Sequence, residues 1–451
     1  MIWKVRDIVK ICNGKLYCGD ENVTCQKFSN DTRTINNGDI YIGIKGDQFD
    51  GNSFYQDAFE KGAGACILEK SYESEIKVTD KPIIIVKDSI EALKNLAMAK
   101  LEIYKPKVIA VTGSVGKTST RDMIYSIISK KYKTLIPEKN YNNHIGLPLT
   151  ILKLQDEEII LLEMGMNHLG EIEYLSNIAK PDVAVITNIL PVHIENLGSM
   201  ENILKAKLEI TSGLKKDGIL IINNDDEYLH NAKIDFSNII TCGIKNNSTF
   251  KALDINDTDF EVNIKNKNFQ FVNSIGTNGY LLNCLIAIAV GVHFDIQVKD
   301  IEEALRECKL TSGRLEKLHS NKGALIINDS YNANATSMIN SLEYLKKEKG
   351  ERKIAILGDI NELGDYAKEE HSKVGKYLAE NSIDYLITIG NNAKYISDEA
   401  SKCMKNIKYF ETKEEAKEFI KQLIKPTDAI VIKASNSCKF IELVNFIKEN
   451  C

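Results

Sequence analysis

The chain has 451 residues, of which 43% are hydrophobic and 27% are charged, the composition of a globular protein long enough for about three domains. Its 58 basic and 63 acidic residues give a net charge of −5, which argues against nucleic acid as the main partner. The ten cysteines include no C-x-x-C pair, so neither a zinc ribbon nor a disulfide framework is indicated, and a reducing cytoplasm is expected.

No segment has the pattern of a membrane span or a secretion signal. The first ten residues, MIWKVRDIVK, interleave charged and apolar side chains, unlike a signal peptide. The apolar run Leu285–Val292 is too short to cross a bilayer. We therefore expect a cytoplasmic protein that does not insert into membranes.

The first part of the chain, residues 1–104, is expected to form a small α/β domain. Residues 89–104 have the apolar spacing of a helix, and Pro106 then interrupts the chain at a candidate domain boundary. On physical grounds alone, the polar turns at 31–33 and 45–51 are surface loops. Short strands are expected at residues 40–44, 65–68 and 83–86.

The next stretch, residues 108–120 with the sequence VIAVTGSVGKTST, is the most informative in the chain. Val108–Val111 is an apolar run that predicts a buried parallel strand, and Gly113–Gly116 predicts a tight turn. A helix then begins at Lys117. A strand, a glycine loop and a helix in this order bind nucleotide phosphates through backbone N–H groups. Lys117 would neutralise the distal phosphates, and the Thr118 hydroxyl would hold Mg2+.

This loop is shorter than the usual P-loop, which has four residues between its two glycines. Val111 stands where the first glycine would be, and the first glycine is instead Gly113. The compressed TGxxGKT pattern occurs in ATP-dependent amide ligases of the Mur and folylpolyglutamate types. The spacing disfavours a P-loop switch or motor, and the flanking strand and helix disfavour a chance Gly-Lys-Thr in a surface turn.

Residues 105–310 alternate predicted strands and helices, as in an open parallel sheet. Ligands of such sheets gather at the carboxyl ends of the strands, where Thr112, Glu163 and the loop Asn188–His193 are placed by strands at 108–111, 159–162 and 183–187. A lone histidine is more often structural. The combination favours a carboxylate and an imidazole that converge on the metal held by Thr118.

The helix expected between Ser199 and Gly213 carries an inward-facing lysine. Lys207 shares a face with apolar residues, whereas Lys205 points the opposite way. That face is formed by Ile203, Ala206 and Ile210. A snorkelling stem or an ion pair would explain Lys207, and so would a low-pKa amine that reacts with CO2 to form a metal-binding carbamate.

The last part of the chain, residues 311–451, returns to a βαβ rhythm. Strands are expected at 324–327, 353–357, 385–389 and 429–432, without a G-x-G-x-x-G pattern, so a Rossmann-like domain is predicted but no dinucleotide. Before it, residues 221–277 are polar, with short alternating strands such as 260–264, and carry no assignable chemistry. An apolar helix at 281–290 contains Asn283.

Nearly the whole chain resembles the Mur ligases. The matching stretches are DTRTINNGDIYIGIKGDQFDG from Asp31, TGSVGKTST from Thr112, NYNNHIGLPLTIL from Asn140, EMGMNHLGEI from Glu163, TNILPVHIENLGS from Thr187, KAKLEI from Lys205, SGRLEKL from Ser312, NDSYNANATSM from Asn328 and LGDINELG from Leu357. The last two stretches point to the member that joins D-alanyl-D-alanine to UDP-N-acetylmuramoyl-tripeptide.

The resemblance implies an α/β protein of three domains. These are a small α/β N-terminal domain that binds the UDP-sugar (1–104), a central P-loop parallel-sheet ATPase domain (105–310), and a C-terminal Rossmann-like domain that binds the dipeptide and closes over ATP (311–451). It also implies the following site residues. ATP is bound by Thr112, Gly113, Ser114, Val115, Gly116, Lys117, Thr118 and Asn283, with Arg314 on the phosphates and Asp329 on the ribose. Mg2+ is bound by Thr118, Glu163, His193 and a carbamylated Lys207, and the catalytic residues are Lys117, Glu163, His193 and Lys207. The UDP-sugar is held by Thr32, Arg33, Asn142 and Asn143, and the dipeptide lies beside Asn332 and Asn334.

The implied reaction forms an amide through an acyl phosphate. A peptide carboxylate attacks the γ-phosphate of ATP, and the amine of D-alanyl-D-alanine then displaces phosphate, which requires positioning and charge neutralisation from the protein. Closure of three domains would keep water off the acyl phosphate. The implied process is peptidoglycan precursor synthesis, and through it cell-wall biogenesis, cell shape, the cell cycle and cell division. A monomer is expected.

Two other interpretations remain open: another Mur or folylpolyglutamate-type ligase with a different acceptor, and a catalytically degenerate Mur-like nucleotide-binding protein. The chain departs from the family pattern in three places. These are Thr277-Asn278-Gly279-Tyr280 for Gly-x-His-Asn, Ala335 for a proline, and Ala434-Ser435-Asn436 for Gly-Ser-Arg. The missing arginine is compatible with weaker carboxylate binding or with a changed acceptor.

Overall fold

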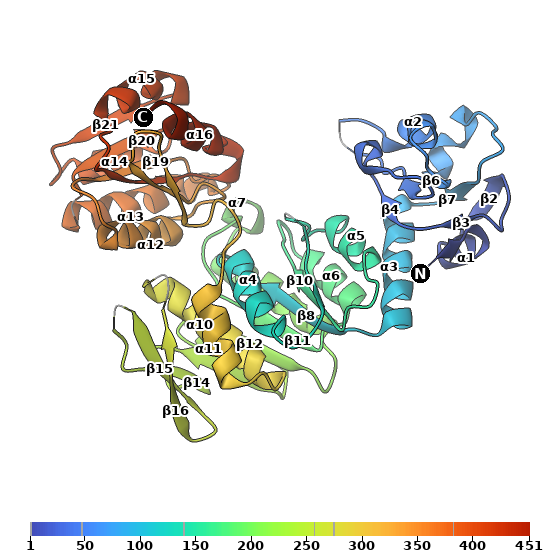
Figure 1. Ribbon diagram of the computed structural model, residues 1–451, viewed down its shortest axis with the longest axis horizontal. Coiled ribbons are helices and arrows are strands. Elements are labelled where there is room, and N and C mark those ends of the chain that lie inside the picture. The colour runs from blue at the N-terminus through green and yellow to red at the C-terminus, as the bar shows by residue number, and fades with distance from the viewer. Residues whose placement is uncertain (1, 47, 139, 257, 274–275, 382) are drawn as a thin grey trace.

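The computed structural model describes residues 2–46, 48–138, 140–256, 258–273, 276–381 and 383–451. The chain forms three lobes in sequence order, with the N-terminal and C-terminal lobes standing on opposite sides of a central one (Figure 1). Each lobe has its own largely parallel sheet covered by helices, as the α/β prediction requires. Asp47, within the predicted turn at 45–51, lies outside the described residues.

The N-terminal lobe contains a five-stranded sheet in the order β2-β7-β6-β5-β4 and a two-stranded ribbon of β1 and β3. Its strands are β1 (Trp3–Lys4), β2 (Lys15–Cys18), β3 (Thr24–Cys25), β4 (Phe28–Ser29), β5 (Ile40–Ile42), β6 (Ala65–Glu69) and β7 (Ile83–Val86). Its helices are α1 (Val5–Ile11), α2 (Tyr55–Glu60) and α3 (Ser89–Tyr104). The three predicted strands are therefore confirmed, although β5 ends two residues early.

The long helix α3 leads from this lobe to the central one (Figure 1). The Asp88 carboxylate caps its first turn by accepting from the N–H groups of Ile90 and Glu91. Lys105 then adopts a left-handed conformation with φ of 48°, and Pro106 prevents the helix from continuing. The predicted boundary at residue 104 falls between α3 and the first strand of the central sheet.

The central sheet has nine strands in the order β16-β15-β14-β13-β12-β11-β8-β10-β9. These are β8 (Lys107–Thr112), β9 (Thr134–Leu135), β10 (Ile159–Glu163), β11 (Val183–Ile186), β12 (Ile219–Asn223), β13 (Ile239–Gly243), β14 (Phe250–Leu253), β15 (Asp259–Ile264) and β16 (Lys267–Val272). The strands from β9 to β14 are parallel, as predicted for this domain, and β15 and β16, in the region where short alternating strands were expected, pair antiparallel at one edge.

The central helices are α4 (Lys117–Ile128), α5 (Gly146–Leu152), α6 (Glu171–Ala179), α7 (Ile194–Leu197), α8 (Met200–Leu208), α9 (Glu227–Asn231), α10 (Asn278–His293) and α11 (Val298–Glu307). Strand β8 lies between β10 and β11 and is buried on both faces. Val108 and Ala110 face the core that contains α5 and α6, and Ile109 and Val111 face the core that contains α4 and α10. This alternation fixes the position of the glycine loop at the carboxyl end of β8.

The C-terminal sheet has six strands in the order β17-β18-β22-β19-β20-β21. These are β17 (Glu316–His319), β18 (Leu325–Asn328), β19 (Lys353–Gly358), β20 (Tyr385–Ile389), β21 (Ile407–Phe410) and β22 (Ala429–Lys433). Its helices are α12 (Ala335–Lys347), α13 (Ala367–Glu380), α14 (Lys394–Ala400), α15 (Lys413–Leu423) and α16 (Ile441–Asn450). The four predicted strands form its centre. The two edge strands were missed because they are half-exposed and mix polar with apolar residues.

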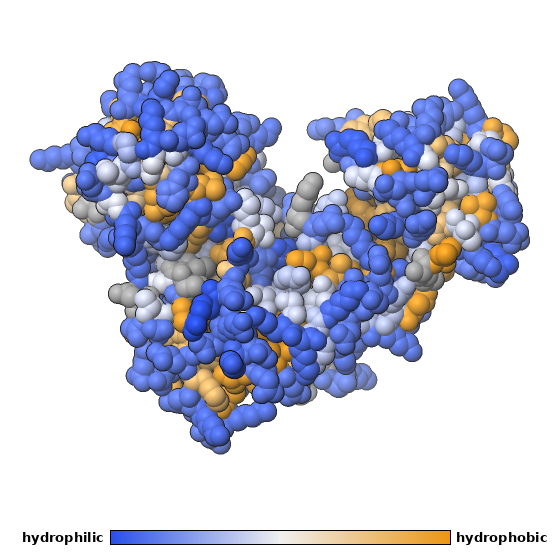
Figure 2. Space-filling view, in the orientation of Figure 1, coloured by the Kyte–Doolittle hydropathy of each residue, from blue (hydrophilic) through white to orange (hydrophobic). Residues whose placement is uncertain are grey.

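The visible surface is mostly hydrophilic and is deeply indented between the N-terminal and C-terminal lobes (Figure 2). Among the described residues, no helix is both long enough and apolar enough to span a membrane.

Candidate active site

A cavity of about 310 Å³ lies where the central and C-terminal lobes meet. The central lobe contributes the glycine loop after β8, the end of β10, the segment before α5 and the segment before α7. The C-terminal lobe contributes the hinge segment before β17, the loop between β18 and α12, and the end of β22. Twelve predicted site residues line it: Ser114, Val115, Gly116, Lys117, Thr118, Asn142, Asn143, Glu163, His193, Arg314, Asn332 and Asn334.

The glycine loop is held in place by the loop after β11. Gly113 has a φ of 141°, and a Cβ there would lie 2.0 Å from the Thr187 hydroxyl oxygen, so only glycine fits. Gly116 has a φ of 83° and lies against Asn283 of α10, whose contact with the nucleotide stays a prediction. The Asn188 carbonyl and side-chain oxygens accept from the N–H groups of Ser114 and Val115, at 3.0 and 2.9 Å.

Those two bonds remove two of the loop N–H groups that were expected to bind phosphate. The N–H groups of Ser114 and Val115 are occupied, so the available anion donors are the N–H groups in the first turn of α4, which a helix leaves without internal partners. The same turn contains Lys117 and Thr118. The anion site therefore lies closer to the helix terminus than the loop sequence alone indicated.

Lys117 lies at this helix terminus and folds back onto the loop. Its ammonium donates to the carbonyls of Gly113 and Ser114 at 2.7 and 3.3 Å. Burial lowers its pKa to about 8, with Glu163 acting in the opposite direction. Because its hydrogen-bond partners are two neutral carbonyls, the Lys117 ammonium can exchange them for the oxygens of an incoming phosphate.

Thr118 and Glu163 form a pair of oxygen donors beside Lys117. The Thr118 hydroxyl donates to Glu163 Oε2 at 3.2 Å and accepts from Arg314 Nη2 at 3.1 Å. Arg121 Nη1 lies 2.8 Å from Glu163 Oε1, but neither atom has a hydrogen bond, so this contact is an ion pair without hydrogen-bond alignment. Glu163 thus combines deep burial with unmet capacity to accept.

These oxygens fit Mg2+, which prefers hard oxygen ligands. The carboxylate oxygen of Glu163 that lacks a hydrogen bond and the adjacent Thr118 hydroxyl are the donors that such a cation needs, and the Arg314 guanidinium lies against the same hydroxyl. The predicted metal set of Thr118, Glu163, His193 and Lys207 stays a prediction. Within the described ranges, no three His, Cys, Asp or Glu side chains are grouped so as to hold a metal ion.

His193 lines the cavity, but its ring contacts the C-terminal lobe. Nδ1 of His193 is hydrogen-bonded to Oε2 of Glu362, in the loop after β19. Burial lowers the pKa of His193 more than the Glu362 carboxylate raises it. The prediction of His193 as a metal ligand stays a prediction, with Nε2 as the nitrogen that remains for it.

Lys207 lies on the buried face of α8, as the helix phase predicted, while Lys205 is exposed. The Ser199 hydroxyl caps the helix by accepting from the Asn202 N–H at 3.2 Å, but α8 ends at Leu208 and a 3-10 turn continues to Ser212. Lys207 is 1% exposed, and among the described residues it has no carboxylate within ion-pair distance. Burial and the nearby Lys117 charge hold the pKa of Lys207 well below its ordinary value.

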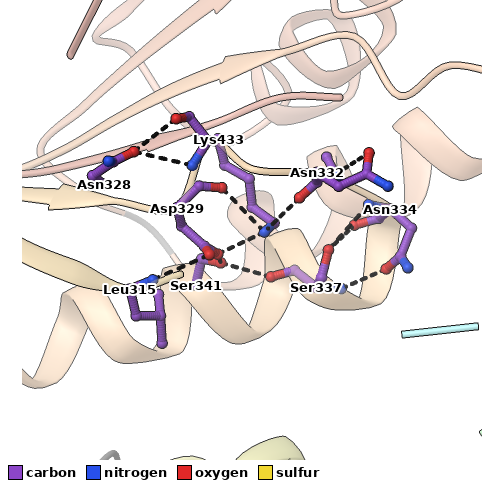
Figure 3. Close-up of polar contacts among 10 residues, drawn as sticks. Leu315, Asn328, Asp329, Asn332, Asn334, Ser337, Ser341 and Lys433 are labelled. Carbon is purple, nitrogen blue, oxygen red and sulfur yellow. Dashed lines mark hydrogen bonds and ion pairs between the residues drawn. The ribbon is translucent and has the colours of Figure 1, made fainter. Parts of the chain in front are cut away.

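The C-terminal wall has a different character. Lys433, at the end of β22, donates to Asp329 Oδ2 at 2.6 Å and to the Asn332 carbonyl at 3.0 Å (Figure 3). Asp329 also accepts from the Ser341 hydroxyl at 2.5 Å and the Leu315 N–H at 3.2 Å. Both carboxylate oxygens of Asp329 are therefore engaged inside the lobe, and the predicted ribose contact would require these bonds to rearrange.

The predicted asparagines line the cavity while they hold its backbone. Asn143 Oδ1 accepts from the N–H groups of Ile145 and Gly146 at the start of α5. Asn334 forms a capping box with Ser337 at the start of α12 (Figure 3). Asn332 Oδ1 accepts from the Ala333 N–H at 2.9 Å. Each of these side chains keeps its NH2 group available to a ligand.

Seven predicted residues lie outside the cavity lining: Thr32, Arg33, Thr112, Gly113, Lys207, Asn283 and Asp329. Thr112 is fully buried and its hydroxyl donates to the Met164 carbonyl at 2.8 Å, so its side chain is already engaged and its nucleotide contact stays a prediction. Gly113 is part of the loop but packs against Thr187, and Asn283 lies against Gly116. Thr32 and Arg33 lie in the N-terminal lobe, where Arg33 pairs with Asp31 at 2.7 Å and its side chain is 84% exposed.

The sequence did not single out several residues that the structure places at the site. Arg121 and Lys433 are buried cations, Tyr331 lies under the Arg314 guanidinium at 4.3 Å, and Glu362 contacts His193. Arg121 had a usable signal, since a charged residue four positions after Lys117 faces the buried side of α4. Lys433 ends an apolar strand, a position at which ligands of parallel sheets gather.

Three family profiles match the chain in succession. The profile described as "Mur ligase family, catalytic domain" covers residues 27–101, "Mur ligase middle domain" covers residues 111–291, and "Mur ligase, glutamate ligase domain" covers residues 313–436. These three segments coincide with the three lobes.

Curated relatives and solved structures match over the full length. The UDP-N-acetylmuramoyl-tripeptide–D-alanyl-D-alanine ligase of Bacillus subtilis (strain 168) is 35% identical, with 99% of this chain and 98% of that protein covered. The enzyme of the same name from Escherichia coli (strain K12) is 31% identical, with 98% of each covered. A crystal structure of MurF from Acinetobacter baumannii superposes with a TM-score of 0.89 at 28% identity and 99% coverage of both chains. That of MurF from Thermotoga maritima in complex with ADP gives 0.81 at 28% identity, with 94% of this chain and 97% of that one covered.

Proposed function

Since this chain belongs to the Mur ligase family, we propose that it joins D-alanyl-D-alanine to UDP-N-acetylmuramoyl-tripeptide in an ATP-dependent reaction of peptidoglycan precursor synthesis. The full-length relatives are named for this reaction, and one of the solved MurF structures holds ADP. The observation that carries the proposal is the cavity between the lobes. It brings Lys117, Thr118 and Glu163 of the central lobe opposite Asn332 and Asn334 of the C-terminal lobe.

The first step joins the tripeptide carboxylate to the γ-phosphorus of ATP. A carboxylate oxygen forms the new P–O bond, the bond from the γ-phosphorus to the bridging oxygen breaks, and ADP leaves with that oxygen. Lys117 exchanges its two loop carbonyls for phosphate oxygens, and the first turn of α4 supplies N–H donors. The Arg314 guanidinium, which already contacts Thr118, lies close enough to stabilise charge on the same phosphates.

Mg2+ bound by Thr118 and Glu163 would supply further neutralisation of the phosphate charge. The protein's own contribution is to position these oxygens. Arg121 is buried beside Glu163 and also pairs with Asp122 at 2.6 Å, which restrains the carboxylate from behind. The role of His193 as a further ligand belongs to this proposal.

In the second step the amine of D-alanyl-D-alanine attacks the acyl carbon. The C–N bond forms, the C–O bond to phosphate breaks, and the amine releases a proton. Asn332 and Asn334 line the cavity and would orient the dipeptide through their NH2 groups, and the Lys433 cation holds the Asn332 backbone. Asn436 stands where the family has an arginine and also lines the cavity, so an amide takes the place of that cation.

Lys207 is proposed to carry a carbamate. Its amine is buried without an ion-pair partner, and an unpaired ammonium there is unfavourable. The neutral amine attacks CO2, a C–N bond forms and a proton leaves, so that the side chain becomes an anion suited to a cation near Glu163.

Three further assignments belong to the same proposal. The N-terminal lobe, residues 1–104, binds the UDP-sugar with Thr32, Arg33, Asn142 and Asn143. Residues 105–310 and 311–451 form the ATP-binding and dipeptide-binding domains. The working unit is a monomer, because one chain supplies both walls of the cavity, and its place is the cytoplasm, since all ten cysteines are free thiols.

The test is phosphate release from ATP with a panel of UDP-muramyl peptides and amine acceptors. Release should require UDP-N-acetylmuramoyl-tripeptide and D-alanyl-D-alanine together. Equal turnover with a single amino acid would instead indicate another Mur-type ligase. Nucleotide binding without turnover under any acceptor would indicate a degenerate binding protein.

A further inference from the structure

The contact between His193 and Glu362 joins two lobes that the catalytic cycle must bring together. His193 lies at the start of α7 in the central lobe, and Glu362 lies in the loop after β19 in the C-terminal lobe. A backbone bond accompanies the side-chain contact, because the Glu195 N–H donates to the Glu362 carbonyl at 3.4 Å. Gly364 also packs against Glu195. Two loops, rather than two isolated side chains, therefore meet here.

Both partners are held in a backbone conformation that residues with a Cβ rarely adopt. His193 has a φ of 58° and Glu362 a φ of 62°. The His193 carbonyl accepts from the N–H groups of Asn196 and Leu197 in α7, at 3.1 and 3.2 Å. The backbone of His193 is thus held by bonds within the central lobe.

Glu362 is fixed just as firmly within the C-terminal lobe. The preceding residue, Asn361, donates its N–H to the Ser435 hydroxyl at 2.9 Å and its side-chain NH2 to the Ser437 hydroxyl at 2.7 Å. The following residue, Leu363, is buried in the core. The carboxylate is therefore aimed across the lobe boundary by residues on both sides of it.

The chemistry of the contact selects one form of the imidazole. An ionised carboxylate can only accept a hydrogen bond, so the hydrogen of the pair belongs to Nδ1 of His193. A neutral ring with its hydrogen on Nδ1 has a lone pair on Nε2. Within the described part of the chain, Nε2 has no hydrogen-bond partner, while His193 lines the same cavity as Thr118 and Glu163.

We propose that Glu362 is a positioning residue: its carboxylate holds His193 in the tautomer with Nδ1 protonated and Nε2 free for a cation in the cavity, and does so only while the two lobes are in contact. Ligating histidines elsewhere use such carboxylates to fix their tautomer and orientation. The inference rests on the function proposed above and deepens it. The metal-binding capacity of His193 becomes conditional on the approach of the lobe that carries Asn332 and Asn334.

The tautomer can be read directly from nitrogen NMR of protein labelled with 15N-histidine. The chain has seven histidines, and a His193→Gln variant identifies the signal of interest. Near pH 8, wild-type protein should show a protonated Nδ1 and an unprotonated Nε2 for His193. Glu362→Gln should lose this fixed preference, because its amide can accept or donate. Glu362→Asp should retain part of it, and Glu195→Gln, an exposed carboxylate of the same interface, should leave it unchanged.

A second readout is the binding of Mn2+, followed by electron paramagnetic resonance, to protein saturated with a non-hydrolysable ATP analogue. Glu362→Gln should weaken Mn2+ binding about 10- to 100-fold, with Glu362→Asp between it and wild type. Glu195→Gln should bind Mn2+ as wild type does.

Either of two results overturns the proposal. One is a wild-type His193 with its hydrogen on Nε2, which needs no variant to fold. The other is a folded Glu362→Gln variant with the wild-type tautomer and wild-type Mn2+ binding. Neither measurement uses the peptide substrate or the acceptor, so a wrong assignment of the overall reaction would appear in phosphate release and not here.

Discussion

The two walls of the cavity differ in whether their buried charged side chains have hydrogen-bond and ion-pair partners. On the C-terminal wall, Lys433 is paired with Asp329, and the neighbouring side chains satisfy one another (Figure 3). On the central wall, Lys207 has no described ion-pair partner, and Glu163 Oε1 and Arg121 Nη1 lack hydrogen bonds although they are buried. Unsatisfied buried polar atoms are rare in native proteins. The difference indicates that the surroundings of Glu163 are completed by ligands, whereas the Lys433–Asp329 cluster is complete by itself; on the C-terminal wall it is Arg314 Nε that is buried without a hydrogen bond.

The largest effect is expected where the central wall meets the nucleotide. Lys117→Ala removes the cation that opposes charge on the transferred phosphate, and should lower kcat by at least about 100-fold. Circular dichroism should show an unchanged fold. A variant that keeps near-normal kcat would mean that the loop does not bind the transferred phosphate during catalysis. The unsatisfied polar atoms of the central wall would then not indicate a nucleotide site.

A smaller loss that can be partly restored is expected deeper in the same wall. Lys207→Ala removes the proposed carbamate and should lose most activity, and a short carboxylic acid added in solution should restore part of it. The matched control is Lys205→Ala, whose side chain is exposed and should be nearly silent. Equal behaviour of the two variants in steady-state assays would contradict the carbamate.

The comparison can also be tested through stability alone. Lys433→Met leaves the buried Asp329 carboxylate without its cation and should reduce the free energy of unfolding by about 3–5 kcal/mol. Lys207→Met replaces an unpaired buried amine and should leave that free energy nearly unchanged or raise it. Urea unfolding of both variants checks this. Equal losses would show that the two lysines do not differ in pairing.

The smallest expected effect concerns the loop that carries Glu362. His371 is buried, its Nε2 accepts from the Ile360 N–H at 3.0 Å, and its Nδ1 is hydrogen-bonded to the Ala367 carbonyl at 2.6 Å. Burial lowers its pKa below the unfolded value of about 6.5, so the unfolded state binds the proton more readily. Stability from this group is therefore fully present above about pH 6.5 and is lost as the pH falls from there through the lower pKa of the folded state. Melting temperatures of wild type and His371→Gln, taken near pH 8 and near pH 5.5, should differ in their pH dependence. Parallel curves would exclude the effect.

Local patterns in the sequence predicted most of the fold. Apolar runs gave the central strands of all three sheets, because strands buried on both faces carry little else. Half-exposed edge strands such as β21 lack that signal. The buried position of Lys207 was also predictable, because it shares one face of the helix with the apolar residues Ile203, Ala206 and Ile210.

The candidate site was predictable where a recognisable motif at a strand end supplies the chemistry, and unpredictable where it depends on contacts between distant segments. Lys117, Thr118 and Glu163 follow from strand ends in a single sheet. The pairing of His193 with Glu362 and of Lys433 with Asp329 depends on contacts between residues over a hundred positions apart, as the separations of 169 and 104 show. No periodicity within one segment contains that information.

The most direct test of the acyl-phosphate mechanism measures the transfer of 18O from the substrate carboxylate to the released phosphate. UDP-N-acetylmuramoyl-tripeptide labelled with 18O in its reacting carboxylate is incubated with ATP, Mg2+ and D-alanyl-D-alanine, and the released phosphate is analysed by mass spectrometry. If the carboxylate attacks the γ-phosphorus, one labelled oxygen per amide formed leaves with phosphate. Amide product accompanied by unlabelled phosphate would contradict the acyl-phosphate mechanism and the role assigned to the cavity between the two walls.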